Sequence, residues 1–354
     1  MTLNTANVPT VDTSSRNKYL RIIDDAWLQH IAPRDDNAPT VISTFAGCGG
    51  SSLGYSMAGF KELLAVEWND NAVETFRLNF PDVPVYHGDI NALSVEQVLE
   101  MTGLKAGELD VFDGSPPCQG FSVAGKRESG DPRNQLFREY VRLLKGLQPK
   151  VFVMENVSGM VKGNMKLIFV EILRELKAAG YQVKACLLNA MYFNVPQSRN
   201  RMIFIGVRND LGIAPSHPKA EVAPFTVGEA IHGLLDDLKE RIIIPDKTKT
   251  SQEMKLVKAG ERHNVHFSQH RLSMQKVAPV IVASRDDYNV FHPTEHRPIT
   301  TLELRRISSF PDTFKYSGSV RDFFERVGNS VPPLFMRSIA IHIRREILSE
   351  VNLT

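Results

Sequence analysis

The feature that most limits the fold is an alternation of short apolar runs and longer amphipathic stretches between residues 41 and 207. Two of the stretches, Asn134–Leu147 and Leu167–Ala179, place apolar side chains on one helical face. Strands that alternate with helices of this length predict an α/β fold, with a doubly wound, mostly parallel sheet and helices on both sides. The short runs, which are typical of buried strands, are Val41–Phe45, Leu63–Trp68, Asp110–Asp113, Val151–Glu155, Lys184–Leu188 and Met202–Val207.

The chain divides into four segments around this pattern. Residues 1–39 precede it as an N-terminal extension with no assigned purpose, in which Lys18–Ile31 is a predicted amphipathic helix. Residues 40–210 form a first domain, and residues 211–296, richer in Pro, His and charge, form a second, smaller lobe of irregular or mixed structure. Helical patterning returns in a closing segment, 297–354, where Pro332–Leu348 is predicted to be a long helix with Pro at its start.

Composition excludes several classes of protein. Of the 354 residues, 42% are hydrophobic and 23% charged, but no apolar run is long enough to span a bilayer. The polar N-terminus lacks a signal-peptide pattern, so the expected location is cytoplasmic. The three cysteines, Cys48, Cys118 and Cys186, lie far apart without metal-ligand spacing, which argues against a disulfide framework and predicts no metal site.

Net charge is only +2, but one segment is strongly basic. Between Arg241 and Arg285 the chain has nine Lys and Arg residues against three acidic ones. Such a segment indicates a face made for a polyanion, although a solvated surface region would have the same charge pattern.

A glycine turn follows the first predicted strand, at Phe45-Ala46-Gly47-Cys48-Gly49-Gly50. Gly47 and Gly49 permit a tight turn and a close approach of the backbone to a ligand. No Lys-Ser/Thr pair follows, so the turn is not a phosphate loop, and Ser52 occupies the third glycine position of the dinucleotide fingerprint. Taken alone, the turn is weak evidence for a ligand, and a purely structural strand-to-helix connection is the default interpretation.

Residues after the next predicted strands suggest what the turn would bind. Glu67 lies at about the distance where an acidic residue binds ribose hydroxyls, and Trp68 offers a flat face for a purine. Asp89 is suited to pair with an exocyclic amine, and Ile90 to cover the ring. Together they fit an adenosine without pyrophosphate, which favours S-adenosylmethionine over a nicotinamide dinucleotide.

Cys118 stands between a rigid Pro-Pro corner and a Gln-Gly turn, in Asp113-Gly114-Ser115-Pro116-Pro117-Cys118-Gln119-Gly120-Phe121-Ser122. This position holds the thiol out of the core, where a thiolate can meet a substrate. Cys48 lies inside the glycine turn, and Cys186 lies in a predicted strand, where a small buried hydrophobe is expected. Cys118 is therefore the candidate nucleophile.

The ordered motifs of the chain resemble those of the cytosine-C5 DNA methyltransferases. The resemblance covers about Thr40 to the C-terminus, except for most of the second lobe, and includes Arg297-Pro298-Ile299-Thr300 and Phe310-Pro311-Asp312 of the ninth motif. The other motifs, in order, are Phe45–Gly50, the Cys118 segment, Glu155-Asn156-Val157, Gln197-Ser198-Arg199-Asn200-Arg201 and Gly328-Asn329-Ser330.

The resemblance implies a mechanism and a set of site residues. The thiolate of Cys118 would add to C6 of a flipped-out cytosine, Glu155 would donate a proton to N3, Arg201 would contact O2, and Arg199 would support the site. The second lobe would recognise the target sequence. The implied S-adenosylmethionine site comprises Phe45, Gly47, Gly49, Gly50, Glu67, Trp68, Asp89, Ile90, Pro116, Asn329 and Ser330, and the implied DNA contacts are Gln119, Ser122, Lys126, Arg262, Arg271 and Arg285.

The implied partner is double-stranded DNA, with the protein acting as a monomer, and a companion restriction endonuclease remains open. Two alternatives share the fold: an RNA (tRNA) cytosine-C5 methyltransferase and a catalytically inactive DNA-binding relative. The tRNA branch usually has a Cys-Phe-Thr signature in the second lobe, and no cysteine follows Cys186. An inactive relative is expected to lack the nucleophile, the acid or an arginine, and this chain has all of them.

Overall fold

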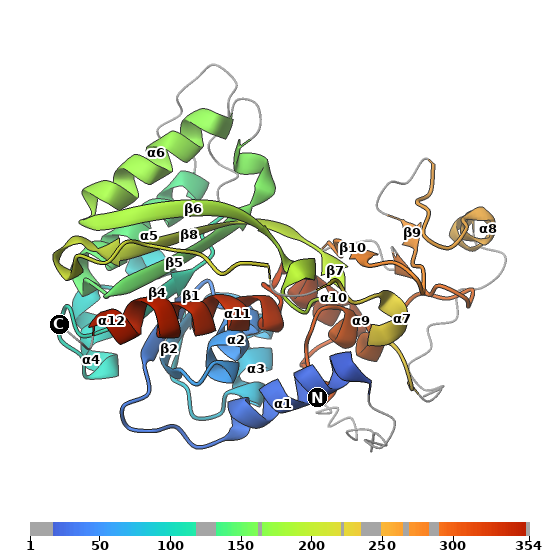
Figure 1. Cartoon of the computed structure of the whole chain (residues 1–354), viewed down its shortest axis with the longest axis horizontal. Helices are drawn as coiled ribbons and strands as arrows, with labels where there is room; N and C mark the ends of the chain where they lie inside the picture. Colours follow the sequence, from blue (N-terminus) through green and yellow to red (C-terminus); the bar gives the residue numbers. More distant parts are fainter. Residues whose placement is uncertain are drawn as a thin grey trace.

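The fold is built on a seven-stranded sheet with the order β3-β2-β1-β4-β5-β8-β6 (Figure 1). The computed structural model describes residues 17–117, 132–161, 165–220, 223–234, 249–264, 269–282 and 290–351. Five strands, from β3 to β5 in this order, pair in parallel. The strands of the sheet are β1 (Thr40–Thr44), β2 (Lys61–Glu67), β3 (Val85–His87), β4 (Val111–Gly114), β5 (Val151–Val157), β6 (Tyr181–Asn189) and β8 (Asn200–Arg208).

One strand runs against the others. β8 lies between β5 and β6 and is antiparallel to both, with Glu155 opposite Ile203 and Cys186 opposite the same residue on the other side. The sheet is therefore mostly parallel, as the sequence pattern predicts.

Alternate side chains of the strands enter two separate cores, one on each face of the sheet. In β5, Val151 and Val153 point to one face, whereas Phe152 and Met154 point to the other. The first face is covered by α1 (Lys18–Ile31), α2 (Gly50–Met57), α3 (Asp70–Asn79) and α11 (Pro333–Ile343). The second is covered by α4 (Val95–Thr102), α5 (Pro132–Leu147) and α6 (Met165–Ala178) (Figure 1).

The N-terminal helix α1 is part of this core. Asn17 caps it, and Tyr19, Leu20 and Ile23 are buried against the α2 side of the sheet. The Tyr19 hydroxyl also donates to the backbone oxygen of Arg306, far away in the sequence. Ile31, which lies on the apolar stripe of the predicted helix, is instead exposed.

The second lobe has little regular structure among its described residues. It contains the short helices α7 (Val227–Ala230) and α8 (Lys249–Leu256) and two-residue strands that pair in two small sheets. One small sheet joins β10 (Ala278–Pro279) to β7 (Gln197–Ser198), and the other joins β11 (Val290–Phe291) to β9 (His270–Arg271).

The closing segment consists of α9 (Thr301–Ile307), α10 (Val320–Asn329) and α11, which continues through a π-helical turn (Arg344–Leu348) into α12 (Ser349–Val351). α11 packs against α2 so closely that a Cβ on Gly54 would lie 2.7 Å from the backbone oxygen of Pro333. Within the described residues, no helix has both the length and the apolar character needed to cross a bilayer.

Candidate active site

The carboxyl ends of the parallel strands lie along one edge of the sheet, where doubly wound sheets bind ligands. The glycine turn follows β1, Glu67 ends β2, the Ser115-Pro116-Pro117 segment follows β4, and Glu155 lies near the end of β5. The sheet thus brings together motifs that are far apart in the sequence.

The glycine turn is held by close packing. Phe45, Gly47 and Gly49 all have positive φ angles, of 55°, 57° and 94°. A Cβ on Gly49 would lie 2.5 Å from the Phe80 ring, and one on Gly50 would lie 2.3 Å from the backbone oxygen of Val331. By contrast, a Cβ on Gly47 would meet nothing within 4 Å, so this part of the turn faces open space.

Glu67 ties the turn to the end of β2. Its Oε2 accepts a hydrogen bond from the Gly47 backbone N–H at 2.8 Å, and its Oε1 accepts from the N–H groups of Trp68 and Asn69 at 3.0 and 2.9 Å. The Trp68 side chain is 74% exposed. A fixed carboxylate and a free aromatic face therefore lie next to the open part of the turn.

Asp89 and Ile90 follow β3. Asp89 is exposed and caps a short 3₁₀ turn, where its Oδ1 accepts from the backbone N–H and the side-chain amide of Asn91. The Ile90 side chain is buried in the core on the α5 side.

The segment after β4 is fixed on both sides. Gly114 packs so tightly that a Cβ there would lie 2.4 Å from Thr44 Oγ1 and 2.7 Å from the Tyr140 ring. At the end of β5, Asn156 Nδ2 donates to the backbone oxygen of Pro116 at 3.0 Å. Cys118, Gln119, Ser122 and Lys126 lie outside the described residues.

Glu155 and Arg201 form an ion pair beside this segment. Arg201 Nε lies 2.5 Å from Glu155 Oε1, and both side chains are largely but not fully buried. Arg199 is close by and more deeply buried, and its Nη1 donates to the backbone oxygens of Gly328 at 3.0 Å and Ile281 at 3.5 Å. Burial, together with the Arg201 charge, lowers the pKa of Arg199 to about 9.

The motif at Gly328-Asn329-Ser330 packs directly on the glycine turn. Ser330 Oγ lies 3.1 Å from Cys48 Sγ, and burial raises the pKa of this thiol to about 11. Cys48 is therefore a poor nucleophile. The Asn329 side chain is exposed.

Cys186 and the groups that could hold a metal ion lie outside the motifs described above. Cys186, expected to be a buried hydrophobe, is instead partly exposed on the outermost strand β6. Among the described residues, no group of three or more His, Cys, Asp and Glu side chains is placed to hold a metal ion.

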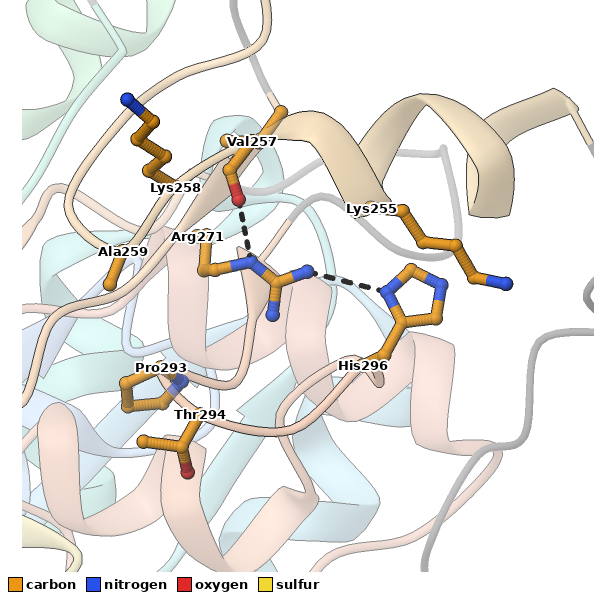
Figure 2. Close-up of a pocket in the computed structure, with 8 residues that line it drawn as sticks. All are labelled: Lys255, Val257, Lys258, Ala259, Arg271, Pro293, Thr294 and His296. Carbon is orange, nitrogen blue, oxygen red and sulfur yellow. Dashed lines mark hydrogen bonds between the residues drawn. The ribbon is translucent and has the colours of Figure 1, made fainter.

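In the second lobe, Arg271 does not present its charge to solvent. The residue is only 9% exposed, and its guanidinium donates to the backbone oxygens of Val257, Met254, His292 and Glu295. Figure 2 shows this guanidinium between Val257 and the His296 ring. The donors of Arg271 hold the lobe together, and its contact with DNA stays a prediction.

An open pocket of about 440 Å³ lies beside Arg271, with Lys255, Lys258 and Thr294 in its lining (Figure 2). Arg262, also expected to contact DNA, is exposed. Arg285 lies outside the described residues.

A set of buried polar residues on the α2 side of the sheet is not predicted from the sequence. Asp113 is 2% exposed and accepts a hydrogen bond from the Tyr55 hydroxyl at 3.3 Å, while Glu62 lies nearby with Ser43 and Ser52. The available signal was a carboxylate, Asp113, at the end of an otherwise apolar strand.

The strand order, in which β8 runs antiparallel between β5 and β6, is that of the S-adenosylmethionine-dependent methyltransferase fold. The candidate site lies at the carboxyl ends of the parallel strands, as expected for this fold. Residues 39–345 match the family of C-5 cytosine-specific DNA methylases. This chain belongs to that family.

Individual relatives agree with this assignment. The chain is 38% identical over 323 residues to the type II methyltransferase M1.HphI of Haemophilus parahaemolyticus, covering 85% of each chain. It is 31% identical over 346 residues to the type II methyltransferase M.NgoPII of Neisseria gonorrhoeae, covering 90% of this chain and 99% of the other.

Solved structures show the same architecture. A prophage-encoded protein from E. coli, assigned as a DNA modification methyltransferase, superposes with a TM-score of 0.75 at 25% identity, over 88% of this chain and all of the other. A Spodoptera frugiperda DNMT2 variant superposes with a TM-score of 0.65 at 19% identity, over 89% of this chain and all of the other, a likeness of fold alone.

Proposed function

We propose that this chain is a sequence-specific DNA cytosine-C5 methyltransferase of the type II kind that uses S-adenosylmethionine and the thiolate of Cys118. The observation that carries the proposal is the clamp at the ends of β4 and β5. There Asn156 holds Pro116, two residues before Cys118, and the adjacent Glu155 pairs with Arg201. The proposed acid and cation thus lie at the end of β5, next to the segment that leads to Cys118.

The residues around the glycine turn fit S-adenosylmethionine. The space above Gly47 is open and the Trp68 ring is exposed for stacking. The Glu67 carboxylate is fixed by three hydrogen bonds, which leaves one lone pair of Oε2 for a ribose hydroxyl. Asp89 and Asn329 are exposed at the same edge. When bound, S-adenosylmethionine supplies an electrophilic methyl group.

The reaction needs a nucleophile because C5 of cytosine is a poor one. Addition of the Cys118 thiolate to C6, with a proton delivered to N3 by Glu155, makes C5 enamine-like and able to take the methyl group. Loss of the C5 proton, release of the thiolate and return of the N3 proton to Glu155 then restore the aromatic ring as neutral 5-methylcytosine. Arg201 holds the Glu155 carboxyl in place and offers its remaining N–H groups to O2 of the base.

Arg199 has a supporting role. Its guanidinium joins the chain between β7 and β8 to Gly328 of the closing segment and to Ile281 of the second lobe. A lobe that contacts DNA is thereby connected to the site where the flipped base is held, and flipping costs a few kcal/mol. Arg262 is a candidate for a phosphate contact, and a restriction endonuclease with the same recognition sequence is the companion expected for a type II enzyme.

The test is bisulfite sequencing of plasmid DNA from a methylation-deficient host that expresses either the wild type or Cys118→Ala. We expect protected cytosines in one recurring short sequence for the wild type and complete conversion for the variant. Complete conversion with abundant, folded wild-type protein would overturn the proposal, and protection by Cys118→Ala would overturn the covalent mechanism.

A further inference from the structure

The helix α1 lies before the part of the chain that matches the methylase family, which begins at residue 39. It is nevertheless packed into the molecule, because Tyr19 and Ala26 have no exposed surface. The helix contacts α7 of the second lobe as well as α2, which follows the glycine turn (Figure 1). Its two ends therefore meet different regions of the protein.

The N-terminal end of α1 contacts the chain where it enters the second lobe. Asn17 Nδ2 donates to the backbone oxygen of Glu229 in α7 at 2.6 Å, while Asn17 Oδ1 caps α1 by accepting from the Leu20 N–H. The Tyr19 ring packs on Phe225, just before α7, with 5.1 Å between the ring centroids. One amide and one aromatic ring thus connect the helix to the lobe.

The Tyr19 hydroxyl reaches the chain that leaves the lobe. It donates to the backbone oxygen of Arg306 in α9, and both residues are fully buried. The Arg306 guanidinium in turn donates to the backbone oxygen of His232 at 2.9 Å. Within the lobe, the Val227 N–H of α7 donates to the backbone oxygen of Lys276 at 2.9 Å. Tyr19 is therefore linked to both connections of the lobe and, through α7, to its basic stretch.

The C-terminal end of α1 supports the glycine turn through a row of rings. The His30 ring lies between Trp27 and Phe80, with centroid distances of 4.6 and 5.2 Å. Phe80 is stacked on Phe76 at 4.5 Å. A Cβ on Gly49 would lie 2.5 Å from the Phe80 ring, so this stack forms the floor of the turn.

Hydrogen bonds hold His30 at this end. Ser56 Oγ of α2 lies 2.8 Å from His30 Nδ1 and accepts from Arg34 Nη2 at 2.6 Å. Burial, together with the Arg34 charge, lowers the pKa of His30 to about 4. The imidazole is therefore neutral at pH 7 and packs as an uncharged ring between α1, α2 and the end of α3.

We propose that α1 is a brace with two separable ends: Asn17 and Tyr19 position the second lobe for DNA, and His30 positions the glycine turn for the methyl donor. Tyr19 and His30 are positioning residues, to which the proposal assigns no contact with either substrate. The proposal rests on the proposed function for the identity of the two substrates. The contacts with the lobe and with the turn do not depend on it.

The expected size of the effect follows from the bonds that would be lost. A hydrogen bond contributes a factor of about 2 to 10 to an equilibrium constant. A lobe that occupies the binding orientation for only a fraction of the time binds with a dissociation constant raised by the inverse of that fraction. The loss of both polar links to the lobe is therefore expected to weaken DNA binding about tenfold.

The experiment compares a double variant, Asn17→Ser with Tyr19→Phe, with His30→Ala and with Asp25→Ala. Ser at position 17 keeps a cap for α1, and Phe at position 19 keeps the ring on Phe225. Asp25 is exposed on the same helix and serves as the control. Fluorescence anisotropy measures binding of a duplex with the recognition sequence found by bisulfite sequencing, and calorimetry measures binding of S-adenosylmethionine.

We expect a crossed pattern. The double variant should bind the duplex about tenfold more weakly and S-adenosylmethionine within about twofold of the wild type. His30→Ala should bind S-adenosylmethionine about fivefold more weakly and the duplex within about twofold, because it loses one hydrogen bond and two ring contacts. Asp25→Ala should change neither constant.

Any other pattern overturns the proposal. Equal weakening of both ligands in both variants would show a general loss of stability, and a ligand whose binding neither variant changes would show that α1 does not position its site. Thermal unfolding checks that the variants fold. If His30→Ala does not fold, Ser56→Ala replaces it, because it removes the hydroxyl between His30 and Arg34.

Hydrogen exchange of the unliganded protein gives a readout that does not depend on activity. We expect faster exchange at the Val227 and Gly228 amides, which bond to the 274–276 segment, in the double variant only. The Gly49 amide should exchange faster in His30→Ala only. If the wild type does not methylate DNA but exchange divides in this way, the proposed function fails and the brace holds. If the wild type methylates DNA and neither binding nor exchange divides, only the brace fails.

Discussion

Arg201 at the edge of the large sheet and Arg271 in the second lobe use the guanidinium group in opposite ways. At the sheet edge, Arg201 pairs with Glu155 beside the segment that leads to Cys118, and part of its side chain remains accessible. In the lobe, Arg271 is turned inward and bonded to four backbone oxygens. A cation in a basic stretch of sequence is therefore not by itself a contact for DNA, because irregular backbone also needs donors.

The closing segment extends this contrast. Arg297 forms a bidentate pair with Glu303 at 2.8 and 2.9 Å, and the fully buried Arg306 forms another with Asp312 at 2.8 Å through both oxygens. These residues lie in the segment that resembles the ninth motif of the family. Their charges hold the short helices and loops of this region together, whereas the large sheet is held by apolar side chains in two cores.

The largest expected effect is at the sheet edge. Glu155→Gln removes the proton donor and is expected to lower the single-turnover rate of methyl transfer about 10²- to 10⁴-fold. Binding of S-adenosylmethionine, measured by calorimetry, should be unchanged because Glu155 pairs with Arg201 and is not one of the residues proposed to hold the methyl donor. A rate close to that of the wild type would remove Glu155 from the mechanism.

In the lobe, the expected effect is on stability. Arg271→Ala removes a donor from the backbone oxygens of residues 254, 257, 292 and 295, at a cost of about 3 kcal/mol in the free energy of unfolding. Arg271→Lys keeps the charge but not the planar fork, so it should lose much of the same stability. Chemical denaturation measures both, and a fully stable lysine variant would contradict the structural role.

The glycine turn offers a test of packing alone. Gly50→Ala places a Cβ 2.3 Å from the backbone oxygen of Val331, so we expect a loss of about 1–3 kcal/mol in stability and weaker binding of the methyl donor. Gly159→Ala is the matched control, because its Cβ would meet nothing within 4 Å. The control should remain within about 0.5 kcal/mol of the wild type. Equal effects of the two substitutions would show that the turn is not tightly packed.

The smallest expected effect is that of Arg262→Ala, because Arg262 is exposed in the lobe. If it contacts a phosphate, the variant should bind all DNA sequences somewhat more weakly, and the slope of log K against log salt should fall by about one. Its thermal stability should match the wild type, in contrast to Arg271→Ala. An unchanged salt slope would exclude Arg262 from the DNA interface.

Much of the fold could be predicted from the sequence because burial within one element leaves a local pattern. The predicted strand Val151–Glu155 lies within β5, and the predicted helix Lys18–Ile31 has the bounds of α1. The motifs also place the glycine turn, Glu67 and Glu155 after or at the end of their strands, where the structure has them. Period-2 and period-3.6 patterns depend on near neighbours only, so a single sequence contains them in full.

Other features depend on residues that are distant in the sequence, and only the tertiary structure decided them. Three features have no local signature: the antiparallel insertion of β8 between β5 and β6, the inward turn of Arg271, and the surface against which α1 packs. The same is true of Asp113 and Glu155, which lie on one face of adjacent strands, since neither residue type nor spacing reports which side chains share a face. The sequence alone determined the helices and strands, the order of the motifs and the family. Which charged side chains meet was decided by the pairing of strands and the packing of helices, because contacts between distant residues form only when the chain is folded.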